Sequence, residues 1–435
     1  MNPAVDKLKL AFLLTGEEVL SGEVTDTNGP LLARSFVELG IGPIAKRLVG
    51  DVLADLKREL KDLSELADWI VINGGLGSTD DDRTNQAVCE TFGVELVEHP
   101  GALAHLSQRL QGPVLPGSLH YKQCLLPKGA EILHNPTGTA VGWDWKKGKT
   151  RIFATPGPPS ELLGMLETAL IPKLSQEKIQ GGVPPIIRFL LMGKGESAAE
   201  VGLKEFLKTK RKQDLLTGLE LGFRASSPYS EVKLWDTNGD HARVNELAGY
   251  METYFAPHLI SQGPELPQVV SELLKERGLN LGIAESCTGG LLASMITNLA
   301  GASEIFKAGV VSYSNEAKVE FLGVSPDTLL KQGAVSEATA KEMLEGILKR
   351  TGADCGISLT GIAGPGGAVE GKPVGTLFIG FGLAGKIQVR RLVIRGDRAQ
   401  FQHTAALTGL DLLRRSLLGL DLQVPYYFDR LKPSI

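Results

Sequence analysis

The sequence has few cysteines, few aromatic residues, little net charge and no long apolar run. Its four cysteines, Cys89, Cys124, Cys287 and Cys355, include no Cys-x-x-Cys pair, which argues against a zinc site or a disulfide framework. A formal net charge of −4 argues against a general nucleic-acid or membrane surface. No apolar run approaches the roughly 18 residues of a membrane-spanning helix, and no signal peptide is apparent before Leu8. We therefore expect a cytoplasmic protein with no membrane and no nucleic-acid partner.

The composition is typical of a soluble globular protein, with 43% hydrophobic and 22% charged residues. A length of 435 residues allows two or three domains with substantial cores. A helical pattern ends at Ile171-Pro172-Lys173, and a Gly- and Pro-rich segment follows at 180–185. A second such segment lies at 261–267. We predict three domains. Residues 1–172 and 261–435 form α/β domains, and residues 173–260 form a small α+β domain between them.

The most informative segment of the sequence is Ala284–Gly290, AESCTGG. It lies between an apolar run, Leu279–Ile283, and another that opens at Leu291, a pattern that predicts a strand, a glycine loop and a helix start. Open α/β sheets bind ligands at this point, and the backbone N–H groups of the loop can face the reacting group. Ser286 is therefore a candidate nucleophile, with a purely structural helix cap as the alternative.

Two further strand ends carry polar residues. The run Val310–Lys318 predicts a short strand, a polar turn and a helix, which places Tyr313 and Lys318 at a strand end. The buried-strand pattern Cys355–Leu359 ends in the glycine-rich turn 360–367, which begins with Thr360 and allows backbone amides to approach a carbonyl or anionic group. The turn lacks the Lys-Ser/Thr pair of a phosphate loop. A Ser/Lys pair is one known way to activate a hydroxyl without histidine.

Residues 268–420 resemble the CinA C-terminal domain, the nicotinamide-nucleotide amidohydrolase family. The matching stretches occur in the order of the family and are AESCTGG (284–290), GVVSYSNEAK (309–318), GAVSE (333–337), TGIAGPGG (360–367), KPVGT (372–376) and GDR (396–398). The resemblance implies a three-layer α/β domain. It also implies hydrolysis of nicotinamide mononucleotide to nicotinic acid mononucleotide and ammonia, in NAD salvage and without a cofactor.

The same resemblance implies residue roles. Ser286 is the expected nucleophile, Lys318 the base, and Tyr313 and Thr360 assisting residues. The implied substrate-binding residues are Thr288, Gly289, Gly290, Gly361, Ala363, Gly364 and Arg398, of which Arg398 meets the nucleotide phosphate.

Simple chemistry constrains these roles. A lysine base must be neutral, so it needs burial or a cationic neighbour. We expect the amides around Gly289 and Gly290 to stabilise the oxyanion that forms when the carboxamide is attacked. Cys287 is a rival nucleophile, but no histidine lies in this stretch to activate it, and cysteine is commonly a small buried apolar residue.

The N-terminal part shows a second strand–loop pattern. Lys9–Leu14 predicts a strand that leads into a loop at 16–22, and Thr27-Asn28 opens a helix. Asp68–Ile72 predicts another buried strand, which runs into the glycine–aspartate turn Asn73–Asp82. Its glycines would free N–H groups for a phosphate, and its aspartates would hold a hard divalent cation. A surface turn with helix-capping carboxylates is the alternative.

This part resembles the molybdenum-cofactor-binding-like N-terminal domain of CinA proteins. The matches are GLG (75–77), TDDDRT (79–84), NPTGTA (135–140) and TPGPPSE (155–161). The resemblance implies a three-layer fold and metal-dependent ADP-ribose pyrophosphatase activity, with Glu18, Asp81 and Asp82 as metal ligands. The implied substrate-binding residues are Asn28, Gly75, Gly77, Thr79, Asn135, Thr139 and Gly157. Asp80 stands where the family has lysine, a change of two charges that weakens the expectation of diphosphate binding.

The predicted partners are therefore small nucleotides, nicotinamide mononucleotide and ADP-ribose, and we expect a homodimer. A molybdopterin-related nucleotide-binding protein and a non-enzymatic competence or recombination partner remain as alternatives. The four residues Ser286, Tyr313, Lys318 and Thr360 favour the enzyme, because a scaffold would not require all of them at strand ends.

Overall fold

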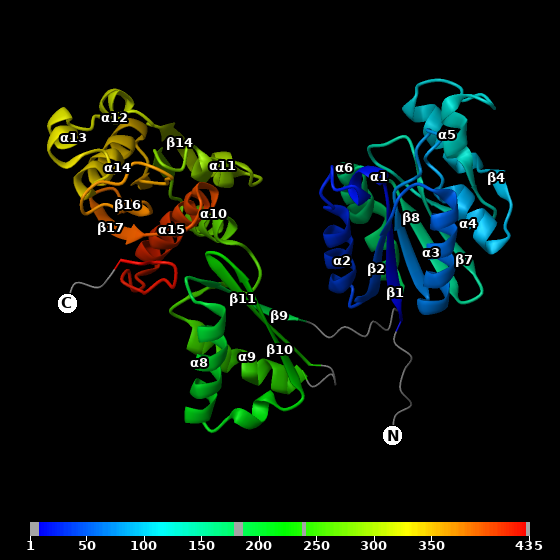
Figure 1. Cartoon of the computed structure of the whole chain (residues 1–435), viewed down its shortest axis with the longest axis horizontal. Coiled ribbons are helices and arrows are strands. Elements are labelled where there is room, and N and C mark those ends of the chain that lie inside the picture. Colours follow the sequence, from blue (N-terminus) through cyan, green and yellow to red (C-terminus); the bar gives the residue numbers. More distant parts are fainter. Residues whose placement is uncertain (1–7, 178–185, 237–240, 432–435) are drawn as a thin grey trace. The chain divides into compact units, whose positions relative to one another are not determined.

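The apolar runs of the sequence form the strands of three larger sheets. The computed structural model describes residues 8–177, 186–236 and 241–431 and divides into two units, residues 1–185 and 186–435 (Figure 1). The first unit contains one six-stranded sheet, and the second contains a four-stranded and a five-stranded sheet. The Gly- and Pro-rich segment at 180–185 lies outside the described residues.

The six-stranded sheet has the order β2-β1-β3-β8-β7-β6. Its first four strands are parallel, and the last two are antiparallel to their neighbours. The bounds are β1 Leu10–Thr15, β2 Pro43–Val49, β3 Trp69–Asn73, β6 Glu131–Leu133, β7 Gly142–Lys147 and β8 Thr150–Thr155. A short antiparallel pair, β4 Leu96–Glu98 with β5 Leu125–Pro127, forms a separate two-stranded sheet.

Helices cover both faces of this sheet. Side chains of β1 alternate between two cores, because successive residues of a strand point to opposite faces. Ala11 and Leu13 pack with α3, α4 and α5, whereas Phe12 and its even-numbered neighbours pack with α2, α6 and α7. The bounds are α1 Glu17–Leu20, α2 Asn28–Glu38, α3 Leu53–Leu66, α4 Thr84–Phe92, α5 Pro100–Arg109, α6 Pro159–Met165 and α7 Ile171–Gln176. This arrangement confirms the predicted three-layer fold.

The helical run does not end at Pro172, as the sequence pattern suggested. A π-helical turn at Leu166–Leu170 joins α6 to α7, and α7 continues to Gln176. Pro172 lies in the first turn of α7, where its missing N–H breaks no α-helical hydrogen bond.

The four-stranded sheet of the second unit is antiparallel, in the order β10-β11-β9-β12. Its strands are β9 Ile187–Met192, β10 Leu219–Ser226, β11 Tyr229–Asp236 and β12 Leu259–Ser261. Helices α8 Glu196–Thr209 and α9 His241–Phe255 pack on one face, against Phe189, Leu191, Val232 and Leu234.

The five-stranded sheet has the order β14-β13-β15-β16-β17, with the first three strands parallel. Ile283 of β13 packs with α10, α11 and α15, and its neighbour Ala284 packs with α12 and α14, so this domain also has three layers. The strands are β13 Leu281–Glu285, β14 Phe306–Val311, β15 Cys355–Gly361, β16 Thr376–Leu383 and β17 Lys386–Val393. The helices are α10 Leu266–Arg277, α11 Leu291–Thr297, α12 Asn315–Leu322, α13 Pro326–Gln332, α14 Glu337–Thr351 and α15 Arg398–Leu418.

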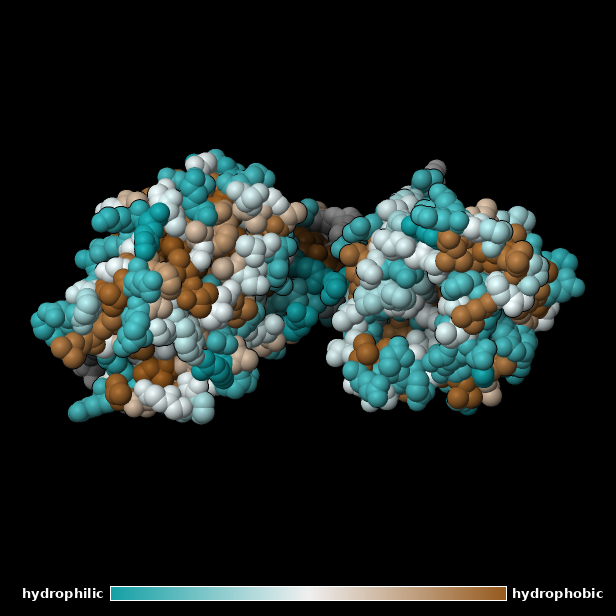
Figure 2. Space-filling model, turned by 90° about the horizontal axis from the view of Figure 1, so that it is seen from above, coloured by the Kyte–Doolittle hydropathy of each residue, from teal (hydrophilic) through white to brown (hydrophobic). Residues whose placement is uncertain are grey.

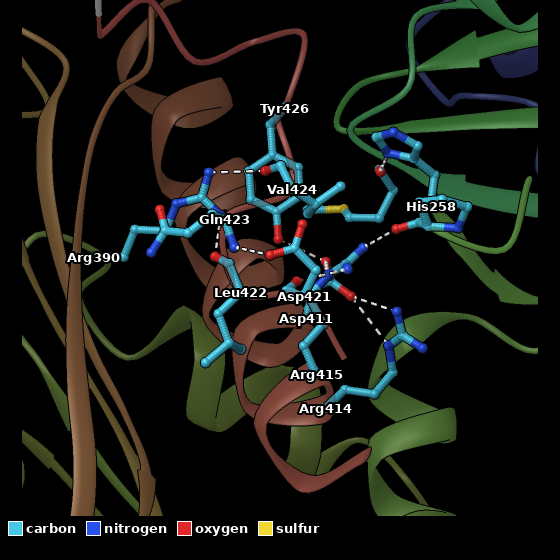
Figure 3. Close-up of polar contacts among 12 residues, drawn as sticks. His258, Arg390, Asp411, Arg414, Arg415, Asp421, Leu422, Gln423, Val424 and Tyr426 are labelled. Atoms are coloured by element: carbon cyan, nitrogen blue, oxygen red, sulfur yellow. Dashed lines mark hydrogen bonds and ion pairs between the residues drawn. The ribbon is translucent and has the colours of Figure 1, made fainter. Parts of the chain in front are cut away.

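A buried polar cluster joins the two sheets of the second unit (Figure 3). Asp411 of α15 is fully buried and accepts hydrogen bonds from Arg414, Arg415 and Tyr426. Arg415 also donates to the carbonyl of Pro257, which precedes β12. Met192, Tyr229 and Ile260 belong to the same core as α15. The boundaries at 172 and 260 stay predictions, since the described contacts divide the chain once, after Pro185.

On the face shown in Figure 2, apolar side chains form small patches among polar ones. Within the described ranges, no helix is both long enough and apolar enough to cross a membrane.

Candidate functional site

The register of the five-stranded sheet brings the three predicted strand ends together. Glu285, the last residue of β13, lies opposite Val311 of β14 and Leu359 of β15. Ser286, Ser312 and Thr360 follow these three residues directly, so they lie side by side at the carboxyl edge of the parallel strands.

Ser286 and Lys318 form a buried pair at this edge. The Lys318 ammonium nitrogen Nζ lies 3.0 Å from Ser286 Oγ, and both side chains are buried. Lys318 also donates to the carbonyls of Ser312, at 2.8 Å, and Tyr313, at 3.3 Å. Helix α12 positions the lysine, because Lys318 and Leu322 are four residues apart and form its buried stripe. The structure therefore brings together the nucleophile and the base that the sequence predicted.

The surroundings of Lys318 favour the neutral amine. Burial lowers the pKa of Lys318, and no carboxylate among the described residues forms an ion pair with it. A neutral amine has two hydrogens and one lone pair. The two carbonyls can accept the hydrogens, which leaves the lone pair for the Ser286 hydroxyl proton.

Cys287 lies in a different environment. Burial raises the pKa of its thiol to about 12, so the reactive thiolate is disfavoured near neutral pH. A Cβ at Gly361 would lie 3.3 Å from the Cys287 sulfur and 2.7 Å from the Thr376 carbonyl, so glycine is needed at that position. Gln402 of α15 donates to the Cys287 carbonyl at 2.9 Å. These contacts support a packing role for this cysteine.

The other predicted residues of this domain lie on neighbouring loops. Arg398 donates to the Tyr313 hydroxyl at 2.7 Å and to the Gly364 carbonyl at 3.1 Å, and so links three loops. The Tyr313 side chain is exposed, and its carbonyl belongs to the Lys318 site. Thr360 is buried and donates to the carbonyl of Ala334 at 2.7 Å. Ala363 is also buried, in the main core.

The start of α11 differs from our expectation. Glu285, a buried carboxylate, accepts hydrogen bonds from the N–H groups of Gly290, Leu292 and Ala293 at 2.8–3.1 Å. The Gly289 N–H donates to the Ser286 carbonyl at 3.2 Å. The amides of Gly289 and Gly290 are therefore already occupied, and the prediction that they meet the oxyanion is wrong for this arrangement. Sequence reasoning missed Glu285, although a charged residue at the end of an apolar strand was a usable signal.

All but one of the predicted N-terminal residues line one cavity of about 590 Å³. It lies at the carboxyl ends of β1 and β3, around the Asn73–Asp82 turn. The predicted residues that line it are Glu18, Asn28, Gly75, Gly77, Thr79, Asp81, Asp82, Thr139 and Gly157.

Asn135 is not among the lining residues. It is fully buried, and its side chain bonds the Gly138 N–H, the Ala140 carbonyl and Glu161. It shapes the 135–140 turn beneath the cavity. Asp80 does not line the cavity either and is exposed.

The cavity is rich in hydrogen-bond acceptors. Asp26, Asp51 and Glu161 line it in addition to the three predicted carboxylates, and no Lys or Arg is among its described lining residues. Sequence reasoning missed Asp51, although it lies two residues after the end of strand β2. Within the described ranges, no group of three or more His, Cys, Asp or Glu side chains could by itself hold a metal ion.

Comparisons with known proteins show which family the chain belongs to. A CinA-like protein of Colwellia psychrerythraea is 37% identical to this chain over 94% of each chain. The chain belongs to the CinA-like family.

Further matches cover the same family. The family model "CinA C-terminal domain" matches residues 264–417, and "Probable molybdopterin binding domain" matches residues 11–176. A CinA-like protein of Kosmotoga olearia is 36% identical over 95% of this chain and 100% of that protein. The crystal structure of competence damage-inducible protein A from Klebsiella pneumoniae is 37% identical, covers 36% of this chain and 97% of its own, and has a TM-score of 0.35.

Proposed function

We propose that the C-terminal domain of this CinA-like protein hydrolyses the carboxamide of nicotinamide mononucleotide to a carboxylate and ammonia. The observation that carries the proposal is the buried Ser286–Lys318 pair, with 3.0 Å between Oγ and Nζ and a lysine pKa lowered by burial. The sequence stretches shared with nicotinamide-nucleotide amidohydrolases indicate which substrate the pair would act on.

The reaction then proceeds through an acyl-enzyme. Lys318 takes the proton of Ser286 while Oγ forms a bond to the carboxamide carbon. When the tetrahedral intermediate collapses, the C–N bond breaks and ammonia leaves with the proton held by Lys318. Lys318 next takes a proton from water, which attacks the ester, and returns it to Ser286 Oγ as the carboxylate departs. Arg398 is an exposed cation at the start of α15 and would meet the substrate phosphate.

Product analysis of the purified full-length protein tests this function. Incubation with nicotinamide mononucleotide in the presence of chelator should yield ammonia and nicotinic acid mononucleotide in equal amounts. Chelator should not matter, since no step of the proposed reaction uses a metal. A protein that is folded by thermal unfolding but leaves the nucleotide unchanged would contradict the proposal.

The acidic cavity supports a second activity, metal-dependent hydrolysis of ADP-ribose in the N-terminal domain. Six carboxylates line the cavity, and only Asp26 among them forms an ion pair within the described residues, with Lys46, so the lining would repel a diphosphate. A hard divalent cation suits these oxygen ligands, and it commonly binds one or two carboxylates and completes its shell with substrate phosphates. One or two of Asp81, Asp82 and Glu18 would hold it, since the described residues contain no group of three such side chains placed to hold a metal ion. Hydrolysis of ADP-ribose by the purified protein, with and without added Mg²⁺ or Mn²⁺, tests this second function.

A further inference from the structure

Most backbone N–H groups of the segment from Ser286 to Ala293 already have a hydrogen-bond acceptor. The N–H of Ser286 bonds the Leu359 carbonyl, and that of Gly289 bonds the Ser286 carbonyl. Leu291 donates to the Thr288 carbonyl, and the other amides at the start of α11 are taken by Glu285. These groups are not available to a substrate without loss of an existing bond.

Three donors in the same turn are left. The N–H groups of Cys287 and Thr288 have no oxygen acceptor among the described residues. The Thr288 side chain is 2% exposed, and its buried hydroxyl has no hydrogen-bond partner within the described chain. A buried hydroxyl without a partner is unusual in a folded protein and needs a specific reason. All three groups belong to the two residues that directly follow the nucleophile.

We propose that the N–H groups of Cys287 and Thr288 and the Thr288 hydroxyl form the oxyanion hole of the amidohydrolase reaction. In hydrolases with a serine on a strand-to-helix turn, the N–H of the residue after the nucleophile is a usual oxyanion donor. When Ser286 Oγ bonds to the carboxamide carbon, the C=O electron pair moves to oxygen and these donors meet the new charge. Collapse of the intermediate returns that pair to the C=O bond as ammonia leaves.

Glu285 gives this arrangement a structural basis. Its carboxylate fixes the first turn of α11 through three N–H groups and is buried behind the loop. Because Glu285 accepts the hydrogen bonds of the N–H groups at the start of α11, the donors left for the oxyanion are those of Cys287 and Thr288. Cys287 contributes its backbone and not its thiol, which explains how a buried cysteine can lie next to the nucleophile without taking its role.

This inference rests on the proposed deamidation and is tested by removing the one donor that belongs to a side chain. Thr288→Val keeps the size and the β-branch but loses the hydroxyl, and Thr288→Ser keeps the hydroxyl. We expect kcat for nicotinamide mononucleotide to fall about 10²–10³-fold in Thr288→Val, with KM within about threefold, because the donor acts in the transition state. Thr288→Ser should retain kcat within about tenfold. The matched control is Thr297→Val, an exposed threonine at the end of α11.

The outcomes separate the two proposals. Ammonia release by the wild-type protein with near-normal kcat in folded Thr288→Val would overturn the oxyanion hole and leave the deamidation intact. A wild-type protein that releases no ammonia would overturn both. An equal loss in Thr288→Val and Thr288→Ser, or a rise in KM alone, would assign Thr288 to packing or ground-state binding. If Thr288→Val fails to fold, comparison of Thr288→Ala with Thr288→Ser, each checked by thermal unfolding, decides the same question.

Discussion

Lys318 is the residue on which the proposed chemistry of the C-terminal domain depends. It is buried, its nitrogen contacts Ser286 Oγ and two backbone carbonyls, and burial lowers its pKa. An ordinary exposed lysine would be protonated near neutral pH and unable to accept a proton. Burial shifts Lys318 toward the neutral amine, the form that the proposed base requires.

The pH dependence follows from the direction of this shift. The neutral fraction of Lys318 grows with pH, so kcat/KM for deamidation should rise through the lowered pKa and then level off. Between the folded and unfolded pKa values the unfolded chain binds more protons, so the free energy of unfolding should also rise with pH there.

Lys318→Arg should lose about 10²–10⁴-fold in rate at every pH, because a guanidinium stays charged. Steady-state kinetics across pH check this, with exposed Lys349→Arg as control. A Lys318→Arg protein with the wild-type profile would show that the lysine only positions the substrate.

At the scale of elements, strand ends determine where the polar residues meet. The strand patterns in the sequence placed β1, β3, β13 and β15 to within about two residues, because their apolar runs are buried on both faces. The sequence could also place Ser286, Lys318 and Thr360 near one sheet edge. It could not show that Glu285 occupies the start of α11 or that Asn135 faces inward, since both depend on which backbone groups lack partners after folding.

The glycine–aspartate turn at 73–82 is the element to test in the N-terminal domain. Asp81 lines the acidic cavity, so Asp81→Ala should lower metal-dependent ADP-ribose hydrolysis by about tenfold or more. Asp80→Ala is the matched control, because Asp80 is exposed and does not line the cavity. Product formation measured with and without chelator checks both. Hydrolysis that persists in chelator, or equal effects of the two changes, would contradict a cation held by this turn.

At the scale of the whole molecule, α15 connects the loops around the Ser286–Lys318 pair to the antiparallel sheet of the same unit. It begins at Arg398 next to Tyr313 and Gly364 and continues to the cluster around Asp411 (Figure 3). In that cluster Arg415 joins Asp411 to the carbonyl of Pro257. Burial raises the pKa of Tyr426, which therefore stays protonated and donates to Asp411. The sequence held no sign of this cluster, because its hydrogen-bonded partners are 3 to 158 residues apart and meet in one place only in the fold.

Asp411→Asn tests how much the cluster contributes to stability. The change leaves Arg414 and Arg415 without their buried counter-charge, so the free energy of unfolding should fall by about 3–5 kcal/mol. Asp327→Asn breaks an exposed pair with Lys331 and should cost less than about 1 kcal/mol. Chemical denaturation of both variants supplies the comparison. Similar values for the two would show that the buried cluster does not stabilise the second unit.

Ser286 is the proposed nucleophile of a nicotinamide mononucleotide amidohydrolase. The most direct test compares the initial rates of ammonia release by Ser286→Ala, Cys287→Ala and the wild-type protein. Ser286→Ala removes the covalent route and should abolish measurable release while the protein stays folded. Cys287→Ala removes a packing thiol with a raised pKa, so it should lower stability and keep most of the rate. Near-normal release by purified Ser286→Ala, or a loss confined to Cys287→Ala, would contradict the account.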